Sequence, residues 1–154
     1  MKRIVGIIAI VVGGLTMAFN YSSPEEKVVV NTVKQEDEGI KFQNLTYEDA
    51  LKLSKRTGKP IFIDCYTSWC GPCKVMARKT FTDKEVGEYF NKNFINLKVE
   101  MEKDADGPEL ARLFKVRAYP TLLFVDGNGD LIKQSLGMIG PNVLMDLAKS
   151  VVNN

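Results

Sequence analysis

The sequence IFIDCYTSWCGPCK, residues 61–74, is the strongest indication of the fold. An unbroken apolar run after Pro60 predicts a short strand that is buried on both faces. A Cys-Gly-Pro-Cys motif follows at the point where this strand passes into a helix. Two cysteines three residues apart lie on one face of the first helical turn, near enough for their sulfurs to bond with little backbone movement. The stretch therefore predicts a reversible redox pair.

The two cysteines are expected to differ. Cys70 falls at the helix N-terminus, where unpaired N–H groups and the helix dipole favour a thiolate; in such motifs the thiol pKa falls from about 8.5 to roughly 3.5–7.5. Cys73, one turn further in, should be less exposed and less acidic, which suits attack on a mixed disulfide. Gly71 lets a substrate chain approach, and Pro72 stiffens the turn without losing a hydrogen bond. Cys70 is thus the predicted nucleophile and Cys73 the resolving thiol.

Residues 69–74, Trp-Cys-Gly-Pro-Cys-Lys, resemble the hallmark of the thioredoxin family. Asp64, six residues before Cys70, falls where that family keeps a buried carboxylate, and residues 119–121, Tyr-Pro-Thr, resemble its cis-proline loop. The resemblance covers roughly residues 40–152. Residues 79–83 and the helix after them look closer to exported thioredoxin-like domains related to the C-terminal domain of DsbD. The resemblance implies a thioredoxin fold.

Asp64 lies in an apolar strand, where an ionisable group is not expected. Burial should raise its pKa toward neutrality, which would let the carboxyl relay a proton to or from Cys73. The resemblance implies this role, and Lys98 in the next strand is the candidate partner. From the residues alone, Asp64 could instead lie at the surface at a strand end, and Lys98 could lie in solvent.

A peptide-binding surface is also implied by the resemblance. In the family the bond before the proline is cis and faces the cysteine pair, and the backbone of the preceding residue pairs with a substrate strand. Tyr119, before Pro120, would then shape specificity. Trp69 would shield the site and pack against substrate. Without the resemblance, Pro120 could be a strand-entry proline and Trp69 a core residue.

The remaining chain predicts an α/β domain with a central mixed sheet flanked by helices. A short strand at 40–42 precedes a helix capped by Thr46 and closed by Gly58. A capping box at 82–85 opens a helix, residues 95–101 form a strand, and Pro108 takes the first position of the next helix. Strands at 121–125 and 131–135 flank the hairpin signal Asp-Gly-Asn-Gly, and a helix at 141–151 closes the chain. The predicted order is β-α-β-α-β-α-β-β-α.

Composition narrows the classes of function. The 154 residues suit one domain, and 45% hydrophobic with 26% charged residues is typical of a globular protein. Lys2 and Arg3 account for the whole excess of 21 basic over 19 acidic residues, so no basic surface indicates nucleic acid binding. With three cysteines and no histidine, a structural zinc site is not expected. We expect no metal and no cofactor other than a Cys70–Cys73 disulfide.

Residues 1–19 have the form of a signal peptide or an N-terminal membrane anchor. A basic start precedes a 16-residue apolar run at 4–19, and residues 16–18 offer a cleavage site. A buried core helix is the weaker alternative. We expect a polar linker at 20–39 and a thioredoxin-like domain at 40–154. The location would be extracytoplasmic, most consistent with a bacterial periplasm, either soluble after signal cleavage or anchored by residues 4–19.

The sequence therefore predicts an exported thiol–disulfide oxidoreductase that reduces protein disulfides as a monomer and receives electrons from a membrane donor. A disulfide oxidase or isomerase is an alternative, as is a non-catalytic thioredoxin-like module that binds peptides. A metal carrier using Cys70 and Cys73 lacks further ligands. Cys65, where the family usually has an aromatic residue, is expected to be a buried structural thiol, with a regulatory thiol as the alternative.

Overall fold

The computed structural model describes residues 38–153, so the predicted signal segment and residues 20–37 of the predicted linker lie outside the described residues. Glu38 and Gly39, at the end of that linker, already contact the domain. Lys84 Nζ lies 3.6 Å from a Glu38 carboxylate oxygen, and the Asn91 side chain donates a hydrogen bond of 3.0 Å to the Gly39 carbonyl. Within residues 38–153, no helix is long and apolar enough to cross a bilayer.

A four-stranded sheet forms the centre of the domain, in the order β2-β1-β3-β4. The β1–β2 pair is parallel, whereas β1–β3 and β3–β4 are antiparallel, which confirms the mixed sheet. The elements in chain order are α1 (Tyr47–Thr57), β1 (Ile61–Tyr66), α2 (Gly71–Lys79), α3 (Lys84–Asn93), β2 (Ile95–Glu100), α4 (Gly107–Phe114), β3 (Thr121–Val125), β4 (Leu131–Leu136) and α5 (Pro141–Val152).

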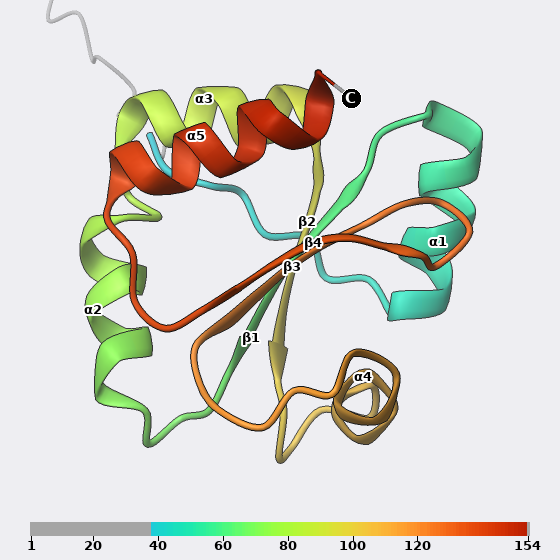
Figure 1. Cartoon of the computed structure of the whole chain (residues 1–154), viewed down its shortest axis with the longest axis horizontal. Helices are drawn as coiled ribbons and strands as arrows, with labels where there is room; N and C mark the ends of the chain where they lie inside the picture. Colours follow the sequence, from blue (N-terminus) through green and yellow to red (C-terminus); the bar gives the residue numbers. More distant parts are fainter. Residues whose placement is uncertain (1–37, 154) are drawn as a thin grey trace, which may run out of the picture. The chain divides into compact units, whose positions relative to one another are not determined.

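Helices cover both faces of this sheet (Figure 1). Side chains of a strand alternate between the faces, so Ile63 and Cys65 point to one side and Phe62 to the other. The Ile63 side packs against buried residues of α1 and α4, whereas the Phe62 side packs against α2, α3 and α5. The strand β1 is therefore buried on both faces, as its apolar sequence predicted.

Several local signals are confirmed. The Thr46 side chain accepts a hydrogen bond of 3.1 Å from the Asp49 N–H and caps α1, and Gly58 ends α1 at a φ of 72°. Between β3 and β4, the Asp126 carboxylate accepts hydrogen bonds of 2.8 and 2.9 Å from the N–H groups of Asn128 and Asp130. This side chain stabilises the predicted hairpin turn.

The order of elements differs from the prediction at two places and reads α-β-α-α-β-α-β-β-α. The predicted strand at 40–42 is wrong. The Ile40 N–H bonds the Phe81 carbonyl, and the Gln43 N–H bonds the Asn96 carbonyl, each at 2.8 Å. These bonds reach different segments, so no ladder forms. The second difference is one of counting: the sequence predicted both the helix that begins at the cysteines and the helix that opens at 82–85. The structure confirms them as α2 and α3, which the predicted order counts as one element.

Two predicted helix starts are also displaced. Asp83, not Thr82, caps α3, because its carboxylate accepts a hydrogen bond of 3.1 Å from the Val86 N–H. The Thr82 hydroxyl instead donates back to the Arg78 carbonyl at 2.9 Å. Pro108 is the second residue of α4 and not the first. Neither shift moves a helix away from its predicted place in the fold.

Candidate active site

Cys70 and Cys73 form a disulfide at the N-terminus of α2, with their Cα atoms 5.4 Å apart. Cys70 is the N-cap residue, and its sulfur accepts a hydrogen bond of 3.2 Å from the Cys73 N–H. Gly71 and Pro72 between them are exposed. The helix-terminal position predicted for Cys70 is therefore confirmed, and it places the sulfur where the helix dipole favours negative charge.

The two cysteines do not differ in exposure, contrary to expectation. Cys70 is 3% exposed and Cys73 is 4% exposed. The bond between their sulfurs holds Cys70 against the first turn of α2, so neither sulfur can project into solvent in this state. If Cys70 is more exposed than Cys73, the difference arises only in the dithiol form.

The loop that leads to Cys70 is attached to the end of β2 through a carboxylate that sequence analysis did not single out. Glu100, almost fully buried, accepts hydrogen bonds from the N–H groups of Ser68 at 2.7 Å and Glu102 at 3.0 Å. Lys103 Nζ also donates to the Ser68 hydroxyl at 2.9 Å. Burial opposes ionisation of Glu100, but the backbone donors outweigh it and hold its pKa below the usual value.

Trp69 lies at the surface beside the disulfide. Its side chain is 65% exposed, which excludes the core alternative. The indole N–H donates a hydrogen bond of 2.9 Å to a Glu102 carboxylate oxygen. The indole also packs edge-on against the Tyr119 ring, with centroids 6.0 Å apart and planes at 76°. Trp69, which precedes Cys70, therefore forms an aromatic pair with Tyr119.

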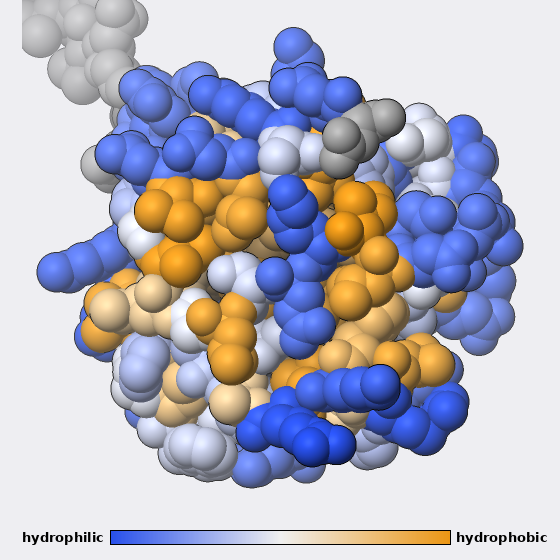
Figure 2. Space-filling model, viewed as in Figure 1, coloured by the Kyte–Doolittle hydropathy of each residue, from blue (hydrophilic) through white to orange (hydrophobic). Residues whose placement is uncertain are grey.

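The Tyr119–Pro120 peptide bond is cis, as the resemblance implied, and Pro120 is buried. The Pro120 carbonyl accepts a hydrogen bond of 2.8 Å from the Gly137 N–H, which attaches the end of β4 to this loop. The neighbouring side chains Leu136 and Met138 are 65% and 53% exposed. Figure 2 shows apolar surface on both sides of a hydrophilic band on the face where β4 and α5 lie in front. Exposed apolar side chains therefore adjoin the loop that carries Tyr119.

Asp64 and Lys98 are brought together by the register of β1 and β2, in which they are direct partners. Lys98 Nζ lies 3.7 Å from Asp64 Oδ2, and Asp64 is 1% exposed, which excludes the surface alternative. Burial raises the pKa of Asp64 to about 6, and the Lys98 charge opposes that rise. Because side chains alternate along β1, Asp64 faces the side of the sheet that α2 covers, the helix that carries Cys73.

Cys65 points to the opposite side of the sheet. It is fully buried among residues of α1, α4 and neighbouring strands, and burial followed by the nearby Asp64 charge raises the pKa of its thiol. A regulatory thiol that traps the Cys70–Cys73 pair would need an exposed sulfur, and the buried Cys65 does not provide one. The predicted buried thiol is confirmed.

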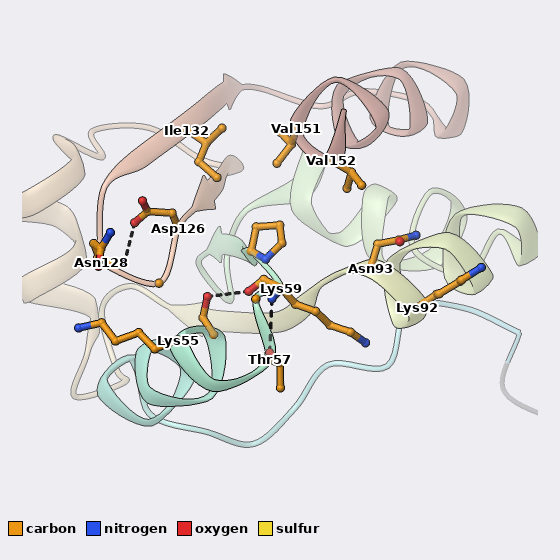
Figure 3. Close-up of a pocket in the computed structure, with 14 residues that line it drawn as sticks. Lys55, Thr57, Lys59, Lys92, Asn93, Asp126, Asn128, Ile132, Val151 and Val152 are labelled. Carbon is orange, nitrogen blue, oxygen red and sulfur yellow. Dashed lines mark hydrogen bonds between the residues drawn. The ribbon is translucent and has the colours of Figure 1, made fainter. Parts of the chain in front are cut away.

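A pocket lies far from the cysteines. It has a volume of about 650 Å³, and its lining includes Pro60, the residue just before β1. Cys70 comes after the opposite end of that strand. In Figure 3 the Lys55 side chain extends to the left of the pocket and those of Lys59 and Lys92 to the right, so the three lysines do not converge on one anion. Within residues 38–153, no three His, Cys, Asp or Glu side chains gather as metal ligands.

Comparison with known proteins agrees with this geometry. A family model described as thioredoxin-like matches residues 41–127. Over 132 residues the chain is 30% identical to the thiol:disulfide interchange protein DsbD of Haemophilus ducreyi; the match covers 84% of this chain but 23% of DsbD. The chain thus spans less than a quarter of that relative's length.

Two solved structures confirm the thioredoxin fold. A Bacteroides thetaiotaomicron protein provisionally named a disulphide-isomerase is 39% identical, with a TM-score of 0.67 over 77% of this chain and 98% of that one. The oxidised C-terminal domain of DsbD from Neisseria meningitidis is 21% identical, with a TM-score of 0.56 over 66% of this chain and 89% of that one.

Proposed function

The chain belongs to the thioredoxin-like family and is a DsbD-related thiol–disulfide oxidoreductase, and we propose that it reduces protein disulfides outside the cytoplasm. Its redox group is its own Cys70–Cys73 disulfide. The observation that carries the proposal is the Cys70–Cys73 disulfide at the N-terminus of α2. The exposed Trp69, next to Cys70 in the sequence, and the cis Tyr119–Pro120 bond support it.

In the proposed reaction the dithiol form transfers two electrons to a substrate disulfide. The Cys70 thiolate attacks one substrate sulfur, which forms a mixed disulfide and releases the other sulfur as a thiolate that takes up a proton. Cys73 then loses its proton and attacks the Cys70 sulfur. The second substrate thiol leaves, and Cys70–Cys73 is oxidised, which is the state described above.

Asp64 is the proposed acceptor of the Cys73 proton. Its pKa of about 6 is close enough to neutrality for the carboxyl to both accept and release a proton near pH 7. Its position on the α2 side of the sheet supports this role, as does the lack of any hydrogen bond to its two oxygens within the described residues. Lys98 is the proposed partner that moderates its ionisation.

Substrate is proposed to bind as an extended segment along the backbone of Tyr119. Trp69, Leu136 and Met138 offer exposed apolar surface on either side of this loop, and apolar groups with a few polar partners suit peptide recognition. Gly71 and Pro72 leave the approach to Cys70 open because neither carries a large side chain. Disulfide-containing proteins are therefore the proposed substrates, and the proposed active form is a monomer.

The reducing direction is supported by the Cys-Gly-Pro-Cys motif. Such motifs span about −270 mV in thioredoxin to about −120 mV in DsbA, and this sequence resembles the reducing end. The predicted signal or anchor at 1–19 would place the domain where cytosolic reductants do not reach, so we propose a membrane protein as electron donor. The mass of the intact exported protein would show whether the segment is cleaved.

Isomerisation is the second candidate, because the similar Bacteroides thetaiotaomicron protein carries that provisional name. Equilibration of Cys70–Cys73 with glutathione separates the two: a potential near −270 mV supports a reductase, whereas one near or above about −180 mV supports an isomerase or oxidase.

The decisive test of the oxidoreductase activity is insulin reduction by the purified protein with dithiothreitol. Cys70→Ser should abolish the acceleration, and Cys65→Ala, on the other side of the sheet, should keep it. Equal acceleration by the Cys70→Ser variant would reject catalysis. A biological function that survives loss of both Cys70 and Cys73 would favour a non-catalytic peptide-binding module.

A further inference from the structure

The Lys98 ammonium is surrounded by three aromatic rings. Its Nζ lies 4.6 Å from the centroid of the Tyr66 ring, 5.6 Å from that of Phe42 and 5.9 Å from that of Phe81. All three distances fall within the range of about 6 Å over which the negative face of a ring attracts a cation. The rings come from β1, from the segment before α1 and from the segment after α2, so three separate parts of the chain converge on one charge.

The same ammonium forms a long ion pair with the Asp64 carboxyl. The distance of 3.7 Å to Oδ2 is too long for a hydrogen bond, and neither carboxyl oxygen has a hydrogen-bond partner among the described residues. The Lys98 side chain is 28% exposed, so water is within its reach. A flexible, strongly hydrated ammonium would ordinarily turn toward that water. Cation–π attraction to the three rings favours the position of the Lys98 ammonium next to Asp64.

We propose that Tyr66, assisted by Phe42 and Phe81, is a positioning residue that holds the Lys98 ammonium next to Asp64 without a hydrogen bond, which leaves both carboxyl oxygens free to exchange a proton with Cys73. This inference rests on the proposed role of Asp64. The rings act on the carboxyl only through the lysine. They supply part of the solvation that the ammonium loses when it leaves water.

Several ionisable groups neighbour Asp64. Lys98 faces it from β2, Tyr66 and Cys65 adjoin it on β1, and α2 contributes Cys73 once the disulfide is reduced. The partner from β3 is Leu122, which does not ionise. Lys98 is the cation that lowers the pKa of Asp64 against the effect of burial. If a ring is lost and the Lys98 ammonium moves toward water, its charge lowers the pKa of Asp64 less. The pKa of Asp64 then rises further above about 6.

Tyr66 is the best residue to replace because it is only partly buried, whereas Phe81 lies in the core. Tyr66→Leu removes the ring, and Tyr66→Phe keeps the ring but removes the hydroxyl. The measurement is an NMR titration of the Asp64 carboxyl carbon in the oxidised full chain, which needs no activity. We expect the Asp64 midpoint to rise by roughly half a pH unit to one unit in Tyr66→Leu and to stay unchanged in Tyr66→Phe.

A double-mutant cycle with Lys98→Met tests whether the ring acts through the lysine. Lys98→Met alone should raise the Asp64 midpoint at least as much as Tyr66→Leu, and adding Tyr66→Leu should raise it no further. An equal additional rise would overturn the inference, because the ring would then act on the Asp64 pKa independently of Lys98. An unchanged or lowered midpoint in Tyr66→Leu would overturn it as well.

Phe42→Leu is the second variant if Tyr66→Leu does not fold. Its ring is more distant, so the expected rise in the midpoint is smaller but of the same sign. No change in this variant contradicts the proposal. The titration is independent of the insulin assay. If the titration fails but insulin reduction is intact, only the positioning role is rejected. The proposed function is rejected only if Cys70→Ser reduces insulin as fast as the wild type.

Discussion

The Glu100 carboxylate accepts a hydrogen bond of 2.7 Å from the backbone N–H of Ser68, two residues before Cys70. The bond joins the end of β2 to the loop between β1 and α2, and it comes from a residue 32 positions away in the sequence. Because the second oxygen of Glu100 accepts from Glu102, which in turn holds the Trp69 indole, one buried carboxylate organises the surface next to the disulfide.

Glu100→Gln should loosen this loop. The glutamine amide offers one acceptor oxygen and an NH2 group, so one of the two backbone N–H donors loses its partner. We expect slower insulin reduction and a changed Trp69 fluorescence spectrum. Glu88→Gln, on the exposed side of α3, is the matched control and should change neither.

The pH dependence of the same variant has a defined sign. The pKa of Glu100 is lowered in the folded protein, so its stabilising contribution is present above the pKa of the unfolded chain and is lost as the pH falls through the folded pKa. The difference in unfolding free energy between wild type and Glu100→Gln should therefore shrink in acid. A difference that grows in acid would contradict this role of the carboxylate.

Trp69→Ala should impair substrate use without unfolding the protein. The side chain is 65% exposed, so the free energy of unfolding should change by about 0.5 kcal/mol or less. Loss of an aromatic anchor at a binding surface should lower kcat/KM for insulin roughly tenfold. Trp69→Phe keeps an aromatic ring but loses the hydrogen bond to Glu102. Its kcat/KM should lie between those of the wild type and Trp69→Ala. A normal kcat/KM in Trp69→Ala would remove Trp69 from the proposed peptide surface.

Features set by neighbouring residues could be predicted from the sequence. The strand followed by Cys-Gly-Pro-Cys predicted where Cys70 lies, Thr46 and Gly58 predicted the ends of α1, and the turn at 126–129 predicted the hairpin. The cis bond before Pro120 came only from the family resemblance, because no local pattern distinguishes it. At 82–85 either Thr82 or Asp83 could cap the helix. The Thr82 hydroxyl donates to the Arg78 carbonyl, so Asp83 is the N-cap residue.

Most features that depend on distant contacts were not predicted. A lone glutamate at a strand end, such as Glu100, has the same local pattern as an exposed charge, and its bond to Ser68 exists only after β1 and β2 pair in parallel. The Asp64–Lys98 pair depends on the same register; it was predicted because Lys98 lies in the next strand, and the structure confirms it. The rings of Phe42 and Phe81 around Lys98 had no sequence signal, because their positions follow from how loops pack over the sheet.

Cys65 should be inert in the folded protein. It is fully buried, and burial raises the pKa of its thiol, so little thiolate forms. After reduction, brief treatment with iodoacetamide at pH 7 should label Cys70 first and leave Cys65 unmodified, whereas denatured protein should carry three adducts in its mass spectrum. Labelling of Cys65 as fast as Cys70 under native conditions would contradict its burial among α1, α4 and the neighbouring strands.

Asp64→Asn should stabilise the oxidised protein at neutral and alkaline pH. Burial raises the pKa of Asp64 from 3.8 to about 6, so the folded protein binds this proton more tightly than the unfolded chain does. Ionised Asp64 therefore costs stability. A difference of about two pH units corresponds to about 3 kcal/mol, which is the expected gain in unfolding free energy of the variant above pH 7.

This gain should disappear in acid. Below about pH 4 the carboxyl is protonated in both states of the wild type, so the two proteins should have similar stability; the difference should open between about pH 4 and pH 6 and then stay constant. Urea unfolding at a series of pH values measures it. Asp146→Asn, at an exposed position on α5, is the control and should show no such step. A variant that is less stable than wild type at pH 8 would mean that the Lys98 charge compensates the buried carboxylate fully, and Asp64 would then be too acidic to take the proton from Cys73.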